Sequence, residues 1–252
     1  MKKTVSFLII ALILCASCIT SSAEQSYSWY MKRRGNNTPI FPDHAQEIEQ
    51  YNAYFVGKSG EKKLYLTFDC GYENGNVERI LDVLKEKDVP AAFFILDNII
   101  LKNTDLVRRM SEDGHIVCNH TKNHKDLSFA TDKEVEKNLK ALEMIYEEKC
   151  GNEIAKYFRF PEGKYSISAL KAVQKMGYKT IFWSFAYDDW DNARQPNAER
   201  SIKKIMDNTH DGAIFLFHPT SSTNAEILPT LIDSWRQMGY DFGTLDELTS
   251  IN

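Results

Sequence analysis

Six polar residues, five of them carboxylates and imidazoles that can move protons or bind a metal and one an arginine that can pair with a carboxylate, lie at or just beyond the ends of apolar runs in this sequence. Carboxylates and imidazoles are the side chains that most often exchange protons in catalysis. His120 and His124, in "NHTKNH", are four residues apart, so a helical turn there would place both rings on one side, as a metal requires. The six residues are Asp69, His120, His124, Arg159, Asp189 and His218.

Each of these residues also has a simpler interpretation when it is taken alone. Asp69 can finish a surface strand, because Asp and Gly suit turns. The two loop histidines can be solvated, and His218, at the end of the apolar run "AIFLFH", can be a hydrogen-bonded core histidine. Arg159 can belong to a surface turn, and Asp189 to a solvated acidic loop with Trp190 tucked inward. Only their shared placement favours a functional site.

The elements that must position these residues alternate along the chain from residue 62 onward. Apolar runs predict strands over residues 62–68, 91–96, 115–119, 157–160, 180–186 and 213–218. Helical spacing of apolar residues predicts helices around residues 77–84, 106–110, 131–151, 169–177, 202–206 and 228–235. Thr131 and Glu134 form a capping-box pattern for the third of these helices.

Alternating strands and helices imply right-handed βαβ units and a mainly parallel, buried sheet. This number of units favours a barrel over an open sheet. Because the carboxyl ends of all strands in a parallel barrel open onto one face, we expect the six polar residues to meet at a single mouth.

The N-terminus has the pattern of an export signal. Lys2 and Lys3 precede an apolar stretch over residues 5–14, which is too short for an ordinary transmembrane helix. We expect cleavage after Ala23. Lipidation at Cys18 is an alternative, although Cys15 stands where a bacterial lipidation signal normally carries Leu. In every case the protein is expected to act outside the cytoplasm.

The composition limits which other kinds of protein this chain can be. The net charge is −4 and no run of Lys or Arg is present, which gives no support for a nucleic-acid partner. The mature chain keeps three cysteines, an odd number that excludes a complete disulfide framework. We expect a signal peptide over residues 1–23, an N-terminal extension packed on the barrel over 24–60, with a short helix over 48–54, and a catalytic domain over 61–250.

At the polar residues the sequence resembles the polysaccharide deacetylase family (carbohydrate esterase family four). The matching motifs are TFD at 67–69, H-T-x-x-H at 120–124, R-x-P-x-G at 159–163, D-W at 189–190 and L-x-H at 216–218. "TFDCGYENG", "IFWSFAYDDW", "GAIFLFH", "NAE" at 224–226 and the N-terminal "SWYMKR" are most similar to the delta-lactam-biosynthetic branch, whose members deacetylate N-acetylmuramic acid in spore cortex peptidoglycan. The resemblance runs from about residue 28 to 248.

The resemblance implies an α/β fold, a distorted (β/α)7 barrel. It also implies that His120 and His124 bind a divalent metal, usually zinc, that Asp69 is the general base and His218 the general acid. The other expected catalytic residues orient and tune this pair, and they are Arg159 and Asp189. The expected substrate-binding residues are Trp190, Glu162, Gly163 and Leu216.

One position departs from the family pattern. Most members carry a second Asp after the base, which completes the metal site, whereas this chain carries Cys70. A thiolate could ligate zinc, or Cys70 could be a bystander while water fills the metal's coordination.

The resemblance therefore predicts a metal-dependent hydrolase that de-N-acetylates muramic acid in the peptidoglycan glycan strand, after an N-acetylmuramoyl-L-alanine amidase has removed the stem peptide. Two alternatives stay open: deacetylation of N-acetylglucosamine in peptidoglycan or chitin-like polymers, and a non-catalytic wall-binding role. We expect a monomer.

Overall fold

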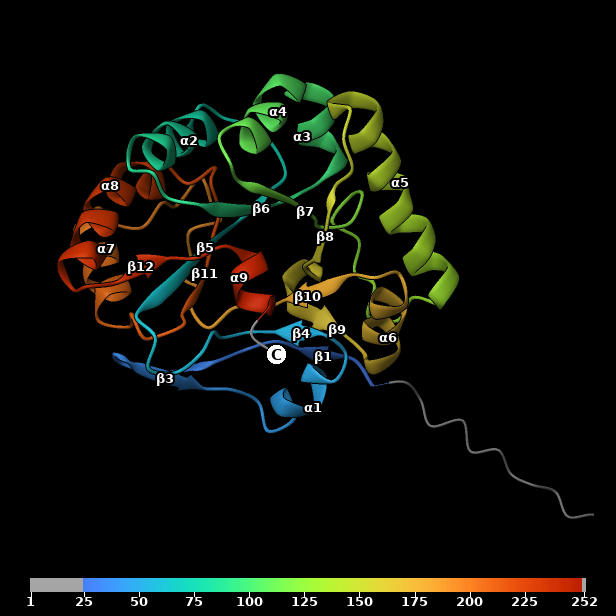
Figure 1. The fold of residues 1–252 in the computed structure, drawn as a ribbon, viewed down its shortest axis with the longest axis horizontal. Coiled ribbons are helices and arrows are strands. Elements are labelled where there is room, and N and C mark those ends of the chain that lie inside the picture. The colour runs from blue at the N-terminus through green and yellow to red at the C-terminus, as the bar shows by residue number, and fades with distance from the viewer. Residues whose placement is uncertain (1–24, 251–252) are drawn as a thin grey trace, which may run out of the picture.

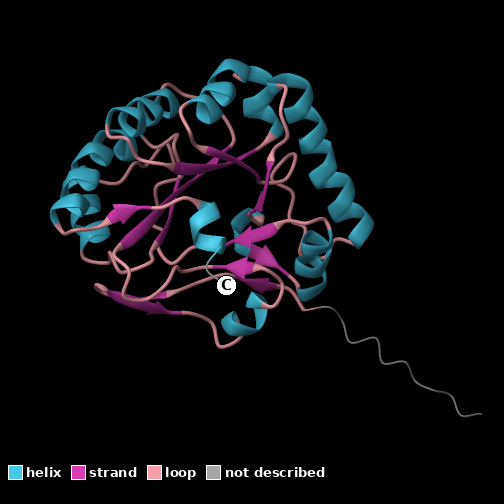
Figure 2. Cartoon of the chain, in the orientation of Figure 1, coloured by secondary structure: helices cyan, strands magenta, loops and turns pink. Residues whose placement is uncertain are grey.

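The computed structural model describes residues 25–250, and its centre is a parallel sheet curled into an incomplete barrel with helices on its outer side (Figures 1 and 2). In spatial order the strands are β11 (Ile214–Phe217), β5 (Lys63–Cys70), β6 (Ala91–Ile95), β7 (Ile116–Asn119), β8 (Ala155–Phe158), β10 (Lys179–Ile181) and β4 (Ala53–Tyr54). A further strand, β12 (Asp241–Phe242), also pairs with β5. Every pairing within this sheet is parallel, which confirms the predicted α/β class and distorted barrel.

The helices of the barrel follow its strands and bury one apolar face each. They are α2 (Asn76–Glu86), α3 (Asp97–Lys102), α4 (Thr104–Glu112), α5 (Asp132–Cys150), α6 (Ile167–Lys175), α7 (Ala198–Met206), α8 (Ser222–Gln237) and α9 (Leu245–Ser250). The predicted capping box of α5 is confirmed, because the Thr131 side chain accepts from the Glu134 N–H and the Glu134 side chain reaches back. Within residues 25–250, no helix is long and apolar enough to cross a bilayer.

Strand β5 shows how the sequence separates the two faces of the sheet. Its even-numbered residues, from Leu64 to Cys70, are fully or almost fully buried in an apolar cluster that they share with α2 and α8. Tyr65, on the other face, belongs to the cluster inside the barrel. Because side chains alternate along a strand, Thr67 and Asp69 follow Tyr65 on the inner face. The sequence of this one strand thus specifies an apolar outer face and, on the inner face, a polar carboxyl end.

The N-terminal segment packs on the barrel and contributes to it. It comprises β1 (Tyr27–Ser28), β2 (Lys32–Arg34), β3 (Asn37–Ile40), α1 (Ala45–Glu49) and β4. β1 pairs with β9 (Lys164–Tyr165), next to a one-turn 3-10 helix, η1 (Pro161–Gly163). The buried Trp29 ring stacks on Phe182, with ring centroids 4.7 Å apart. The division between extension and catalytic domain at residue 60 stays a prediction, and the predicted signal peptide lies outside the described residues.

Two predicted elements of the barrel differ in the structure. The helix expected over residues 48–54 ends at Glu49, and Ala53 and Tyr54 pair with β10 as β4. The strand expected over 180–186 ends at Ile181, and Phe185 instead forms a parallel bridge with Phe215 of β11. This segment leaves β10 at Ile181 and runs alongside β11, so its residues cannot all pair with the same strand. The crossing delivers residues 187–190 to the carboxyl end of β11.

Candidate active site

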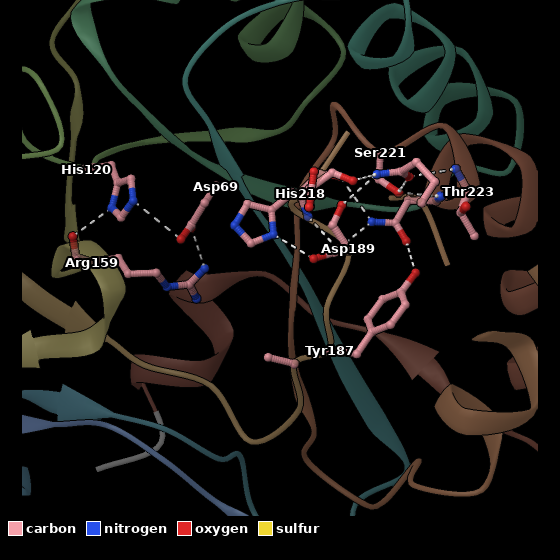
Figure 3. Close-up of polar contacts among 12 residues, drawn as sticks. Asp69, His120, Arg159, Tyr187, Asp189, His218, Ser221 and Thr223 are labelled. Carbon is pink, nitrogen blue, oxygen red and sulfur yellow. Dashed lines mark hydrogen bonds and ion pairs between the residues drawn. The ribbon is translucent and has the colours of Figure 1, made fainter. Parts of the chain in front are cut away.

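Five of the six predicted polar side chains meet at the carboxyl ends of the strands. In Figure 3 the Asp69 carboxylate lies between the imidazole rings of His120 and His218. Asp69 Oδ2 is 3.4 Å from His120 Nε2, and Asp69 Oδ1 accepts a hydrogen bond from Arg159 Nη1 at 2.8 Å. Asp189 is paired with His218 on the far side. The segments after β5, β7, β8, β10 and β11 thus converge on one point.

Arg159 is a fully buried cation rather than part of a surface turn. Its Nη2 donates to the Thr67 hydroxyl at 2.8 Å, its Nε donates to the Ile181 carbonyl at 2.9 Å, and its guanidinium lies 4.2 Å from the Phe94 ring centroid. A buried charge is tolerated only when its donors are satisfied. This many fixed partners hold the guanidinium, and through it the Asp69 carboxylate, in one orientation.

The surroundings of Asp69 keep it ionised. Burial on its own would raise the pKa of this carboxyl group, but the guanidinium of Arg159 and the imidazole of His218 counter burial, and the pKa of Asp69 lies below the ordinary value. An ionised carboxylate at neutral pH can accept a proton. Asp69 therefore has the protonation state that a general base needs.

His120 is held as a neutral imidazole with a free lone pair. Its Nδ1 lies 2.9 Å from the Arg159 carbonyl, which can only accept, so Nδ1 carries the hydrogen. Its Nε2 is buried and has no hydrogen-bond partner. Burial, only partly offset by Asp69, lowers the pKa of His120 to about 4. A neutral ring with a fixed tautomer and an unused Nε2 is the form in which histidine binds metals.

His124 reaches its neighbour by a different backbone path from the one the spacing suggested. The loop is not a helical turn, because Thr121 and His124 have left-handed φ values of 72° and 59°. The Thr121 N–H is held by the Asn119 side chain at 2.9 Å. His124 is exposed, and its ring centroid lies 5.0 Å from that of His120. Strained backbone of this kind is concentrated at functional sites.

The residues present fit part of a metal site. His120 and His124 offer adjacent imidazoles, and one of them has an unpartnered buried nitrogen. Cys70 is fully buried in the apolar layer on the helix side of β5, and burial raises the pKa of its thiol well above the ordinary value, which disfavours the thiolate that binds zinc. Across residues 25–250 no three His, Cys, Asp or Glu side chains are grouped as a metal site. The fit therefore rests on the two histidines, with Cys70 as a bystander.

His218 is held as the partner of a buried carboxylate. Its Nδ1 donates to Asp189 Oδ1 at 2.7 Å, and its backbone N–H donates to Asp189 Oδ2 at 2.9 Å. Burial works to lower the pKa of His218, but Asp189 outweighs it and raises the pKa above the ordinary value. The ring nitrogen that Asp189 leaves free faces Asp69 (Figure 3). His218 is thus poised to carry a proton toward the point that Asp69 faces.

The four predicted substrate-binding residues are placed differently from one another. Trp190 is 60% exposed, as a ligand-stacking ring must be. Glu162 points to solvent and pairs with Lys164 at 2.6 Å. Gly163 has φ +65° and is packed so closely that a Cβ would lie 2.8 Å from the Trp183 ring, while Leu216 is buried. Contacts of these four residues with a substrate stay predictions.

Sequence reasoning missed three residues that complete the site. Thr67 shares the inner face of β5 with Asp69, and the two-residue spacing was the signal for it. Asn224 Nδ2 donates to Asp189 Oδ2 at 2.6 Å, and the Tyr187 hydroxyl donates to Asn224 Oδ1. The "NAE" motif contained Asn224, but nothing in the sequence predicted that the first turn of α8 would contact Asp189.

The sequence of this chain is similar to those of known proteins. The family model for polysaccharide deacetylases matches residues 56–181. The chain is 38% identical over 238 residues to an uncharacterized 30.6 kDa protein of Geobacillus stearothermophilus, covering 92% of this chain and 89% of that one. It is 34% identical over 254 residues to the peptidoglycan-N-acetylmuramic acid deacetylase PdaA of Bacillus subtilis, covering 98% and 96%.

Solved structures give the same result. Bacillus subtilis PdaA, described as a family 4 carbohydrate esterase, superposes with a TM-score of 0.86 at 34% identity, covering 89% of this chain and 97% of that one. A Bacillus anthracis protein described as a pseudoenzyme of that family superposes at 0.72 with 26% identity, covering 78% and 68%. Membership alone therefore does not prove activity. In fold, in motif order and over nearly its whole length, this chain belongs to the polysaccharide deacetylase family, carbohydrate esterase family 4.

Proposed function

We propose that this protein is a hydrolase that removes the acetyl group from N-acetylmuramic acid residues of peptidoglycan. The observation that carries the proposal is the Asp69 carboxylate held between two imidazoles in different states. Hydrolysis of an amide needs one proton taken from water and one given to the leaving nitrogen. An ionised Asp69 and a His218 with a raised pKa supply that acceptor and that donor.

The residues act in sequence on the acetamide group. Asp69 accepts a proton from the water whose oxygen attacks the carbonyl carbon, and Arg159 keeps the carboxylate ionised and aimed. His218 then donates its proton to the nitrogen as the C–N bond breaks, so acetate leaves and an amine stays on the sugar. Asp189 stabilises the protonated ring before that transfer. A divalent metal, for which zinc suits the donors, would be held by His120 and His124 and would polarise the carbonyl.

Two lines favour muramic acid as the sugar. The likeness to the muramic acid deacetylase covers 98% of this chain, whereas that to the peptidoglycan-N-acetylglucosamine deacetylase PgdA of Listeria monocytogenes covers 74%. The product chemistry also fits, because an amine on muramic acid can condense with the lactyl carboxylate of the same sugar. That closure gives the muramic δ-lactam of spore cortex.

The lactam proposal fixes the order of events and the location. A stem peptide occupies the lactyl carboxylate, so an N-acetylmuramoyl-L-alanine amidase must act before the ring can close. The substrate is outside the cytoplasm, and we propose that a signal peptide cleaved after Ala23 exports the protein as a monomer. An anchor at Cys18 is the alternative, and both residues lie in the part of the chain that the structure does not describe.

The test compares three substrates: peptide-free peptidoglycan glycan, the same glycan with stem peptides, and an N-acetylglucosamine oligomer. We expect acetate release from the peptide-free glycan, a mass loss on the muramic acid residue, and loss of activity with a chelator that added zinc restores. Release from N-acetylglucosamine alone would assign the other sugar. No release from any of the three with metal restored would leave a non-catalytic wall-binding role.

A further inference from the structure

The mouth of the barrel is where this chain exposes aromatic rings. Among the described residues, the aromatic side chains classed as exposed are Tyr30, Tyr72, Phe129 and Trp190. The last three lie in loops that follow Asp69, His124 and Asp189, whereas Tyr30 belongs to the N-terminal segment. Large exposed apolar groups gathered around a polar site are typical of a ligand-binding surface.

Tyr72 differs from the other exposed rings because it is held in place. It lies three residues after Asp69 and is 44% exposed. The side-chain amide of Asn192 donates a hydrogen bond to its hydroxyl oxygen. The hydroxyl end is therefore fixed, while part of the ring stays open to solvent.

The contact between Tyr72 and Asn192 spans the loop that begins with His218. In the sheet β11 lies beside β5, and Phe185 bridges β11 on its other side. The loops after β5 and after Phe185 therefore flank the loop after β11. The contact joins the two loops on either side of the one that begins with His218, which places Tyr72 on the His218 side of the mouth.

The loop that carries Tyr72 is fixed from two further sides. Asn98 Nδ2 donates to the Gly71 carbonyl at 3.1 Å. Asn74 Nδ2 donates to the Thr220 carbonyl at 2.9 Å, and Asn76 Nδ2 donates to the same oxygen at 3.1 Å. A rigid loop presents its ring without an ordering cost when a ligand binds.

We propose that Tyr72 is a substrate-binding residue on which a pyranose ring of the glycan strand stacks, next to the sugar that is deacetylated. The ring face matches the C–H face of a sugar, while the hydroxyl end stays hydrated or bonded. This proposal rests on the proposed function. It assigns to the rim a site for a neighbouring sugar of the strand, so it predicts a preference for polymeric substrate.

The test measures kcat and KM of Tyr72→Ala, Tyr72→Phe and a control, Met144→Ala, which removes an exposed apolar side chain from the outer helix α5, on peptide-free glycan and on the monosaccharide N-acetylmuramic acid. We expect Tyr72→Ala to raise KM for the polymer by about ten-fold with kcat within about two-fold of the wild type, and to change the reaction of the monosaccharide, which has no neighbouring sugar, little. Tyr72→Phe keeps the ring and loses the bond to Asn192, so it should stay close to the wild type. Met144→Ala should match the wild type on both substrates.

Three results would overturn the proposal: an unchanged KM for Tyr72→Ala, an equal loss on polymer and monosaccharide, or a Tyr72→Phe variant as impaired as Tyr72→Ala. The last two would assign Tyr72 a structural role through Asn192. If the wild type releases no acetate, the proposed function fails separately, and co-sedimentation with insoluble glycan then compares wild type and Tyr72→Ala. Stronger retention of the wild type would still support the stacking site, and equal retention would reject it.

Discussion

His120 and His218 each directly follow a strand of the same sheet, β7 and β11, yet their environments shift their pKa values in opposite directions. His120 donates to a neutral carbonyl, and burial lowers its pKa to about 4. His218 donates to the buried carboxylate of Asp189, which raises its pKa above the ordinary value in spite of burial. The same side chain is thus held neutral in one region and favoured in its protonated form in the other.

The difference teaches that burial acts on both histidines and that the partner of Nδ1 decides whether its effect on the pKa is overcome. Both rings face the same carboxylate, Asp69, so the difference between their pKa values arises from the groups that Nδ1 contacts on the other side of each ring. A carbonyl fixes a tautomer without adding charge, whereas a carboxylate favours the protonated ring. The following predictions test this contrast.

The largest effect is expected for Asp69→Asn, which removes the anion that the two imidazoles share. The amide keeps an acceptor for Arg159 but cannot take a proton, so kcat should fall by about 10³-fold. Acetate release from peptide-free glycan measures the loss, and the melting temperature should stay close to that of the wild type. Retained activity would remove Asp69 from the role of base.

His120→Ala should abolish metal binding, because it removes the imidazole whose Nε2 is buried and unpartnered. Zinc content after dialysis measures this directly, and activity should fall with it. Cys70→Ala is the matched control and should keep its metal, since the thiol lies in the apolar layer of β5. If Cys70→Ala lost the metal as well, the thiol would be a ligand and the bystander interpretation would be wrong.

Asp189→Asn should make His218 more like His120. The raised pKa of His218 keeps the ring protonated to higher pH, and a general acid loses activity as pH rises through its pKa. Without the carboxylate the pKa falls, so the alkaline limb of the kcat profile should move to lower pH, with a loss of about 10–100-fold at neutral pH. A profile with an unmoved alkaline limb contradicts the assignment of His218 as the acid.

The smallest effect is expected at a third buried histidine, His115, in which neither ring nitrogen has a hydrogen-bond partner. Both ring nitrogens of His115 are unpartnered, and burial lowers its pKa to about 4 against the pull of Asp113. The unfolded chain binds a proton near the ordinary pKa of about 6.5 and the folded chain does not, so this histidine removes stability as pH falls from 7 to 5.

His115→Leu should therefore lose less stability between pH 7 and pH 5 than the wild type, by about 1–2 kcal/mol. Urea unfolding at the two pH values measures the difference. The half-buried His44 hydrogen-bonds to the Tyr165 hydroxyl, and its variant His44→Gln is the control for an unspecific effect of histidine removal. Equal pH dependence in His115→Leu and the wild type would show that His115 protonates without cost.

The sequence by itself determined most of the alternation of strands and helices after residue 62, the α5 cap, and which residue types lie at the strand ends. Local patterns suffice for these features, because alternation along a strand and helical spacing are set by the backbone. It also placed Asp69 and His218 at the carboxyl ends of their strands, because the apolar runs end at these residues.

Only the tertiary structure decided how those residues pair. Arg159 contacts Asp69 across 90 positions, and Asp189 reaches His218 because the chain leaves β10 at Ile181 and crosses to β11. The same folding turned Cys70 away from the histidines and brought Asn224 behind Asp189. Charge and burial at each group depend on these distant neighbours, and no local pattern in a single sequence encodes them.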